Sequence, residues 1–293
     1  MPEEGELRRF EYHEPKSLDE ASELLGTLGE GAFILAGGTD LFVEIRERLR
    51  EVKHLINIKR ISDLSAIEYS ETSGLRFGAL VTAGELEAEP SVIRYYPNLR
   101  RALAELASIQ VRNRATVIGN ICRASPSADT IPPLIADGAS IETFRPEGGR
   151  TIPLAEFFAG PGRTVLEQGE IAIAIIIPPP QQGSGRSYIK HGRRKAMELA
   201  TVGVAVSLDA KDNICTGARI ALGAVGPVVL RAHKAEEILI GSSFDQNTVE
   251  RVAEQAMQEC TPISNVRSSA EYRRSMVGVL TRRAIELARE EPA

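Results

Sequence analysis

The stretch "AFILAGGTDLFVEIRERLREV", residues 32–52, decides the fold of the N-terminal part of the chain. Its first five residues are typical of a buried strand, and the two adjacent glycines, Gly37 and Gly38, indicate a turn. The following run has apolar residues on one helical face, namely Leu41, Ile45, Leu49 and Val52. The next run, "HLINI", is a second strand. The pattern therefore predicts strand, glycine turn, helix and strand.

The turn itself leaves two interpretations open. A helix N-terminus attracts anions, and Thr39 and Asp40 are suitable N-cap residues, so the loop could hold an anionic ligand. It could equally be a tight turn without a ligand, because short glycine motifs are weak evidence. The stretch is neither GxGxxG nor a P-loop with its Lys and Ser/Thr, so a Rossmann fingerprint and a Walker motif are both excluded.

A second unusual run is "VRNRATVIGNICRASPSADTIPPLIADGA", residues 111–139. Its small residues leave little bulk, and its short polar side chains can form hydrogen bonds without a net positive charge. The polar candidates are Thr116, Asn120, Ser125 and Asp129. Such an uncharged groove suits a pyrophosphate held by backbone N–H groups, with a carboxylate accepting from sugar or ribityl hydroxyls. The alternative is a loop stabilised by its own Asx and Ser turns.

The remaining patterns predict an α+β chain with more than one domain. A helix begins at Ser17 and ends near Gly29, a hairpin turns at Ser73 and Gly74, and Thr82 begins another helix. The run "PPPQQGSG", residues 178–185, is typical of a linker. Beyond it we expect strands at 201–208 and 218–225 and helices at 248–259 and at the C-terminal end. The apolar stripe of the last helix is predicted to be core: Met276, Leu280, Ala284, Leu287 and Ala288.

Composition excludes several classes of function. The 293 residues carry a formal charge of −5, which gives no electrostatic reason to bind nucleic acid. The longest aliphatic run is shorter than the roughly 20 residues that a membrane span needs, and the first ten residues show no apolar leader, so we expect a cytoplasmic protein without a membrane span. The three cysteines and four histidines are scattered, so no disulfide framework, metal site or hydrolytic triad is predicted.

Taken together, the two runs carry a family resemblance. Residues 36–41 and 112–129 resemble the AGGTDL and RNxATIGGN loops, and the following Ser-Pro-x-x-Asp element, of the FAD-binding medium subunits of molybdenum hydroxylases, the group of carbon monoxide dehydrogenase and xanthine dehydrogenase. Similar segments begin at Phe157, Tyr188 and Asn265, so the resemblance covers nearly the whole chain. It implies a two-subdomain FAD-binding domain of the vanillyl-alcohol-oxidase (PCMH) type at 1–179, divided into about 1–58 and 59–179, and an α+β C-terminal domain at 186–293.

The resemblance also implies the residues that would hold FAD. The first loop would be Leu35, Ala36, Gly37, Gly38, Thr39 and Asp40, and the second would be Thr116, Gly119, Asn120 and Ser125. Asp129 would accept from the ribityl hydroxyls. Lys190 lies in a stretch that approaches the isoalloxazine in related subunits, although a solvent-facing strand lysine is an equal alternative.

Two residues depart from this pattern or invite another interpretation. Ile118 stands where the family motif has its first glycine, and a branched side chain cannot adopt φ > 0, so the loop is expected to be reshaped. Cys122 invites a redox interpretation, but the extra cluster of the 4-hydroxybenzoyl-CoA reductase type needs cysteines that are missing. A small thiol packed under a loop is the favoured interpretation.

The resemblance implies an electron-transfer subunit that holds FAD and has no catalytic residue for the substrate step. Molybdopterin and [2Fe-2S] clusters would be on partners, an iron-sulfur small subunit and a molybdenum large subunit, in a dimer of heterotrimers. Two alternatives stay open. One is a free-standing FAD oxidoreductase with its own substrate, which the low aromatic content of 5% disfavours. The other is a flavin-free structural module.

Overall fold

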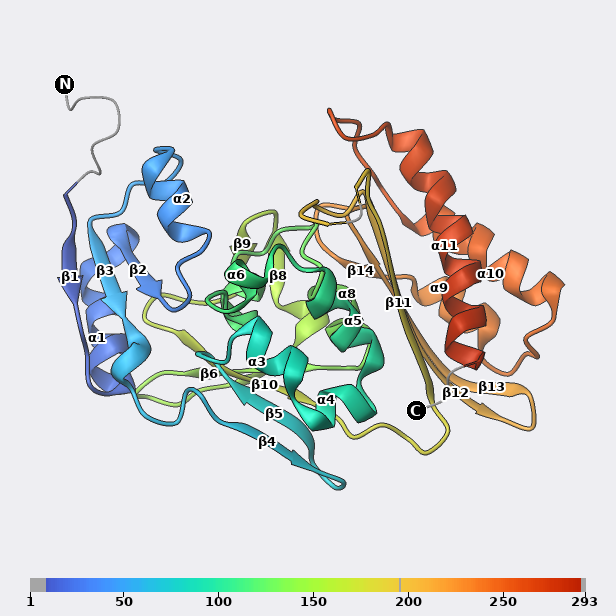
Figure 1. Ribbon diagram of the computed structural model, residues 1–293, viewed down its shortest axis with the longest axis horizontal. Helices are drawn as coiled ribbons and strands as arrows, with labels where there is room; N and C mark the ends of the chain where they lie inside the picture. Colours follow the sequence, from blue (N-terminus) through green and yellow to red (C-terminus); the bar gives the residue numbers. More distant parts are fainter. Residues whose placement is uncertain (1–8, 195, 291–293) are drawn as a thin grey trace.

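Three parallel strands form the N-terminal sheet at one end of the molecule (Figure 1). The computed structural model describes residues 9–194 and 196–290. Ser17 is the N-cap of helix α1, and its hydroxyl accepts the amide of Glu20, so the predicted start is confirmed. The strand order is β1-β3-β2. The bounds in this unit are β1 Glu11–His13, α1 Leu18–Leu28, a 3₁₀ turn at Gly29–Gly31, β2 Ala32–Leu35, α2 Leu41–Arg46, β3 His54–Asn57 and a 3₁₀ turn at Ile58–Arg60.

Helix α2 is shorter than the sequence predicts. The expected apolar face ran to Val52, but the helix ends at Arg46 and Arg48 has a φ of 57°, which turns the chain out of the helical path. Val52 is still buried, whereas Leu49 is 76% exposed. Asp40 does stand at the N-cap position of α2, but it has helical φ and ψ and its side chain makes no capping hydrogen bond.

The central sheet is antiparallel and has the order β4-β5-β10-β6-β7. Strand β10 has the sequence "IAIAIII" and lies in the middle, where five of its seven residues are buried. The hairpin predicted at Ser73 and Gly74 is present as β4 and β5. The bounds are β4 Ile67–Ser70, β5 Gly74–Gly78, β6 Ser140–Phe144, β7 Thr151–Pro153 and β10 Ile171–Ile177, with a small separate hairpin of β8 Phe158–Gly160 and β9 Arg163–Thr164 and a 3₁₀ turn at Leu154–Glu156.

Six short helices lie between β5 and β6. Helix α3 begins with the capping box predicted from Thr82 and Glu85. The run 111–139, for which a loop was the alternative interpretation, contains the whole of α7 and α8, because Thr116 and the prolines at the start of α8 provide helix starts within it. The bounds are α3 Ala83–Ala88, α4 Pro90–Tyr95, α5 Pro97–Glu105, α6 Ile109–Arg112, α7 Val117–Cys122 and α8 Ile131–Ala136.

The C-terminal sheet is antiparallel, in the order β11-β12-β13-β14 (Figure 1). The long helix α11 packs on β11 and β12, α9 packs on β13, and α10 packs on α9 and α11. In α11 the residues Leu280, Ala284 and Ala288 are buried, and the half-buried Met276 packs against the same core, so the predicted core stripe is confirmed there. The bounds are β11 Gly185–His191, β12 Val202–Lys211, β13 Ile214–Gly223, β14 Leu230–Arg231, α9 His233–Leu239, α10 Gln246–Glu259 and α11 Ala270–Glu290.

Helix α8 connects the central and C-terminal parts. It packs on β12 and β13, and its Pro132 lies so close to Gly223 that a Cβ there would be 2.9 Å from the proline ring. The mixed α+β architecture predicted from the sequence is confirmed. Within the described ranges, no helix has the length and apolar character that a membrane crossing requires.

Candidate functional site

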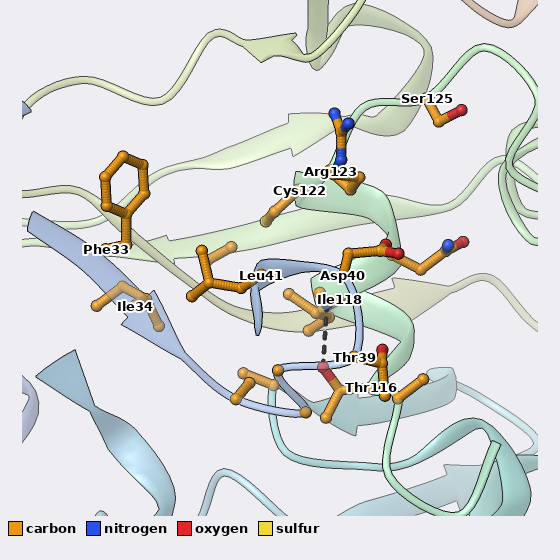
Figure 2. Close-up of a pocket in the computed structure, with 18 of the residues that line it drawn as sticks. Phe33, Ile34, Thr39, Asp40, Leu41, Thr116, Ile118, Cys122, Arg123 and Ser125 are labelled. Carbon is orange, nitrogen blue, oxygen red and sulfur yellow. Dashed lines mark hydrogen bonds between the residues drawn. The ribbon is translucent and has the colours of Figure 1, made fainter. Parts of the chain in front are cut away.

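A cavity of about 1010 Å³ lies between the N-terminal sheet and helix α7. Its walls come from β2 and the loop after it, from residues 115–129, from residues 166–172 and from residues 197–199. Figure 2 shows Thr39 and Asp40 opposite α7, with Cys122 and Arg123 further along the same wall. The volume is at the upper end of the range for small-molecule and cofactor sites, so the cavity suits an extended ligand.

The cavity brings together both predicted loops. Every predicted site residue except Leu35 and Lys190 is in its lining, which contains Ala36, Gly37, Gly38, Thr39, Asp40, Thr116, Gly119, Asn120, Ser125 and Asp129. Leu35 instead lies in a small core with Ile45, Val52 and Leu55. It supports the loop from behind.

The two adjacent glycines have different physical roles. At Gly37, a Cβ would lie 2.3 Å from the Arg114 carbonyl oxygen and 2.9 Å from the Ala115 Cα, so no side chain fits between the two loops. At Gly38, φ is +76°, in the left-handed region that favours glycine. The bare backbone therefore serves first to bring the second loop against the first.

Helix α7 is held at its start by Thr116. The Thr116 hydroxyl accepts the Gly119 amide at 3.1 Å, and Thr116 also forms a β-bridge with Thr82. Asn120 accepts a hydrogen bond at its side-chain oxygen from the Thr130 hydroxyl at 2.8 Å. With that oxygen engaged, the NH₂ group is the main hydrogen-bonding group that Asn120 can offer to a ligand.

Ile118 does not reshape the loop in the way expected from the sequence. The residue lies inside α7, so its backbone is helical and no positive φ is required. It is 3% exposed, belongs to the main core and forms part of the apolar wall of the cavity. The expected conformational conflict is therefore wrong.

The groove is charged, contrary to the prediction of an uncharged one. Glu44 on α2 accepts from Arg50 and from Arg123, each at 2.8 Å, and all three residues line the cavity. Glu44 is 8% exposed. Sequence reasoning missed this cluster, although Glu44 follows Leu41 by three residues and so shares its helical face.

Asp129 has partners from the C-terminal sheet on both carboxylate oxygens. The Tyr188 hydroxyl donates to Oδ1 at 3.1 Å and the Lys190 ammonium donates to Oδ2 at 2.7 Å. Burial raises the pKa of Asp129, and the Lys190 charge opposes that rise. The Lys190 side chain is only 8% exposed and also donates to the Glu105 carbonyl, so the solvent-facing alternative is wrong.

Cys122 lines the cavity as a half-buried residue of α7. Burial raises the pKa of its thiol to about 12, so the thiol is protonated near neutral pH and is a poor nucleophile. This chemistry suits a packed wall residue.

Family comparisons identify the chain. A model described as the FAD binding domain in molybdopterin dehydrogenase matches residues 8–180, and one described as the CO dehydrogenase flavoprotein C-terminal domain matches residues 187–288. The chain belongs to the FAD-binding medium subunits of molybdenum hydroxylases. These are oxidoreductase subunits.

Individual medium subunits are similar along almost their whole length. The carbon monoxide dehydrogenase medium chain of Hydrogenophaga pseudoflava is 38% identical over 96% of this chain and 97% of its own length. A putative xanthine dehydrogenase FAD-binding subunit of Escherichia coli K12 is 32% identical over 94% of this chain and 95% of its own.

Solved structures show the same fold. A chain of carbon monoxide dehydrogenase from Hydrogenophaga pseudoflava, in a form that lacks the Mo-pyranopterin moiety, superposes with a TM-score of 0.95 at 36% identity and covers 98% of this chain and 100% of the other. A chain of quinoline 2-oxidoreductase from Pseudomonas putida 86 gives 0.89 at 31% identity, with coverages of 97% and 98%.

The cavity of this medium subunit fits a dinucleotide on its own chemistry. Gly37 and Gly38 both line the cavity and have no side chains of their own, so a pyrophosphate can approach their backbone groups closely. Hydroxyl and amide groups of Thr39, Asn120 and Ser125 line the same space and can pair with polar ligand atoms. Ile118 supplies apolar wall.

Proposed function

We propose that this medium subunit holds FAD in the cavity between its two loops and relays electrons from an iron-sulfur subunit to an external acceptor. One observation carries the proposal: loops that are about 75 residues apart in the sequence meet at Gly37 and Arg114 and line one cavity. When bound, FAD would supply the two-electron redox chemistry. The work of this chain is to bind, orient and shield it.

Most of the predicted residues have a proposed task in or beside that cavity. The backbone of residues 36–40 and the start of α7 near Gly119 would hold the pyrophosphate, while Asn120 and Ser125 would donate to neighbouring polar atoms. Asp129 would accept from ribityl hydroxyls. Because Lys190 reaches the cavity through Asp129, we propose it as a positioning residue that keeps this carboxylate charged.

The assembly is also part of the proposal. Molybdopterin and [2Fe-2S] clusters would be on a large and a small partner subunit, in a dimer of heterotrimers. Exposed apolar side chains in and after α2 and in the cavity-lining segment 197–199 support a partner surface, because apolar area on a protein surface often marks an interface. They are Phe42, Val43, Leu49, Met197 and Leu199. A cytoplasmic location and the domain limits 1–179 and 186–293 stay predictions.

The first experiment tests flavin binding by the isolated chain. Purified protein is mixed with excess FAD, desalted and examined by visible absorption. We expect a flavin spectrum with about one FAD per chain. A colourless protein that remains folded by circular dichroism would support the flavin-free structural module instead.

The second experiment tests the relay. The native complex and the lone FAD-loaded subunit are mixed anaerobically with candidate substrates, and flavin bleaching is followed. We expect bleaching in the complex alone, with molybdenum and iron in the complex by elemental analysis. Equal bleaching rates in both samples would support a free-standing oxidoreductase.

A further inference from the structure

Three metal-ligating side chains meet on the N-terminal sheet, away from the flavin cavity. Glu11 and His13 are two residues apart on β1 and so point to the same face, and His54 on β3 is the register partner of Glu11. The pairing places His13 Nε2 3.3 Å from His54 Nδ1, and Glu11 Oε2 3.3 Å from the same His54 nitrogen. The third separation, Glu11 Oε2 to His13 Nε2, is 3.9 Å.

These separations match those of ligands around one small cation. Tetrahedral Zn²⁺ with bonds of about 2.0–2.2 Å holds neighbouring ligand atoms about 3.3–3.6 Å apart. Two of the three pairs are already at that spacing. The Glu11 side chain is 73% exposed, so a small rotation closes the third without disturbing the core.

The chemistry of the set also favours a metal. A hydrogen bond between the two imidazoles satisfies these two nitrogens with one proton, but it gives the neighbouring carboxylate oxygen no partner. One divalent cation, in contrast, accepts lone pairs from all three atoms. The histidine side chains are 23% and 19% exposed, so the site is partly shielded but reachable from solvent. Two imidazoles and a carboxylate are ligands that suit Zn²⁺.

We propose that Glu11, His13 and His54 form a zinc site that fastens β1 to β3. Among the residues that the structure describes, strand β1 is a three-residue edge strand with β3 as its one partner, so its attachment to the sheet rests on few backbone contacts. A cation bound by both strands cross-links them. Water would complete the coordination on the exposed side.

The test uses the full FAD-loaded chain, free of any affinity tag and stripped with a chelator. Zn²⁺ is titrated by calorimetry, and Co²⁺ is titrated in parallel because tetrahedral Co²⁺ has strong visible bands. We expect about one Zn²⁺ per chain, a rise in Tm on binding and a tetrahedral Co²⁺ spectrum.

Three variants locate the site. We expect His54→Asn to abolish binding, and Glu11→Gln, at an exposed position that leaves packing intact, to weaken it by about tenfold or more. The matched control is His233→Ala, since His233 also lies beside a carboxylate, 3.6 Å from Glu236, but has no second histidine there. It should bind like wild type.

Two results would overturn the zinc proposal. No Zn²⁺ uptake by the wild-type chain overturns the proposal and leaves an ordinary hydrogen bond between the two imidazoles. Wild-type affinity in Glu11→Gln and His54→Asn also overturns it. If His54→Asn does not fold, Glu11→Gln and the Co²⁺ spectrum of the wild type still decide.

Discussion

At Gly37, the backbones of two distant loops meet with no side chain between them. We expect Gly37→Ala to lower the free energy of unfolding by about 1–3 kcal/mol and FAD affinity by about tenfold or more, because its Cβ would meet the Arg114 carbonyl at 2.3 Å. Urea denaturation and flavin titration measure both effects.

The control for this substitution is Gly26→Ala. Gly26 lies inside α1 and its Cβ would meet nothing closer than 3.8 Å, so the change should be neutral or stabilise by about 0.5–1 kcal/mol. Unchanged FAD affinity in Gly37→Ala would contradict the proposed contact.

Glu170 gives the chain a defined acid sensitivity at the rim of the cavity. Burial alone would raise the pKa of Glu170, but hydrogen bonds from Arg150 and from the Glu167 amide outweigh it and hold this pKa at about 2. The unfolded value is about 4.3. Since the folded pKa is the lower one, the stability that Glu170 contributes is present above about pH 4.3 and is lost as pH falls toward about 2.

We therefore expect Glu170→Gln to destabilise the chain by about 1–3 kcal/mol near pH 7 and by clearly less near pH 3. Urea denaturation at both pH values measures the difference. The exposed neighbour Glu167 provides the control, Glu167→Gln, with a much smaller effect. An equal loss at both pH values would falsify the linkage.

At the scale of elements, α7 depends on one side chain for its start. We expect Thr116→Ala to cost about 0.5–2 kcal/mol and to weaken FAD binding, while Thr116→Ser retains both, because the Gly119 amide needs a hydroxyl acceptor. Thermal unfolding and flavin titration report the two effects.

The helix cap at Asp245 provides a control that distinguishes a loss of stability from a loss of FAD binding. Asp245 caps α10, where it accepts the Thr248 amide at 3.0 Å, far along the chain from the cavity. Asp245→Ala should lower Tm but leave FAD affinity unchanged. If Thr116→Ala also lowered Tm without changing FAD affinity, the Thr116 cap would have no role in shaping the cavity.

Sequence patterns predicted the elements whose signals are local. The sequence signals for the caps at Ser17 and Thr82 and for the strand before Gly37 lie within a few residues of these features. All three features are present in the structure. The end of α2 was missed because a positive φ at Arg48 has no strong signal in a non-glycine residue.

The sequence predicted which residues line the cavity but not which ion pairs form there. The loops carry compositional signals, but the Arg123 to Glu44 ion pair joins residues that only the tertiary fold brings together. The same limit applies to His13 and His54, whose separation along the chain gave no metal-site spacing, although parallel pairing places them side by side.

At the scale of the whole molecule, the Asp129 to Lys190 pair joins the cavity to the C-terminal sheet. We expect Lys190→Met to cost about 3–5 kcal/mol, because it leaves a buried carboxylate without its cation. The double variant Asp129→Asn with Lys190→Met should be less destabilised than the sum of the single changes.

Denaturation of all three variants completes this cycle. Lys211→Met, at an exposed end of β12, is the control and should be nearly neutral. Strictly additive losses would show that the two side chains do not stabilise each other.

The placement of Asp129 has a consequence for engineering and for evolution. Its carboxylate belongs to the segment matched by one family model, but both of its donors, Tyr188 and Lys190, belong to the segment matched by the other. An N-terminal fragment that ends within residues 178–185 would keep Asp129 but lack both Tyr188 and Lys190. Chimaeras that exchange the C-terminal part between relatives should therefore succeed only where the carboxylate and its two donors are inherited as a set.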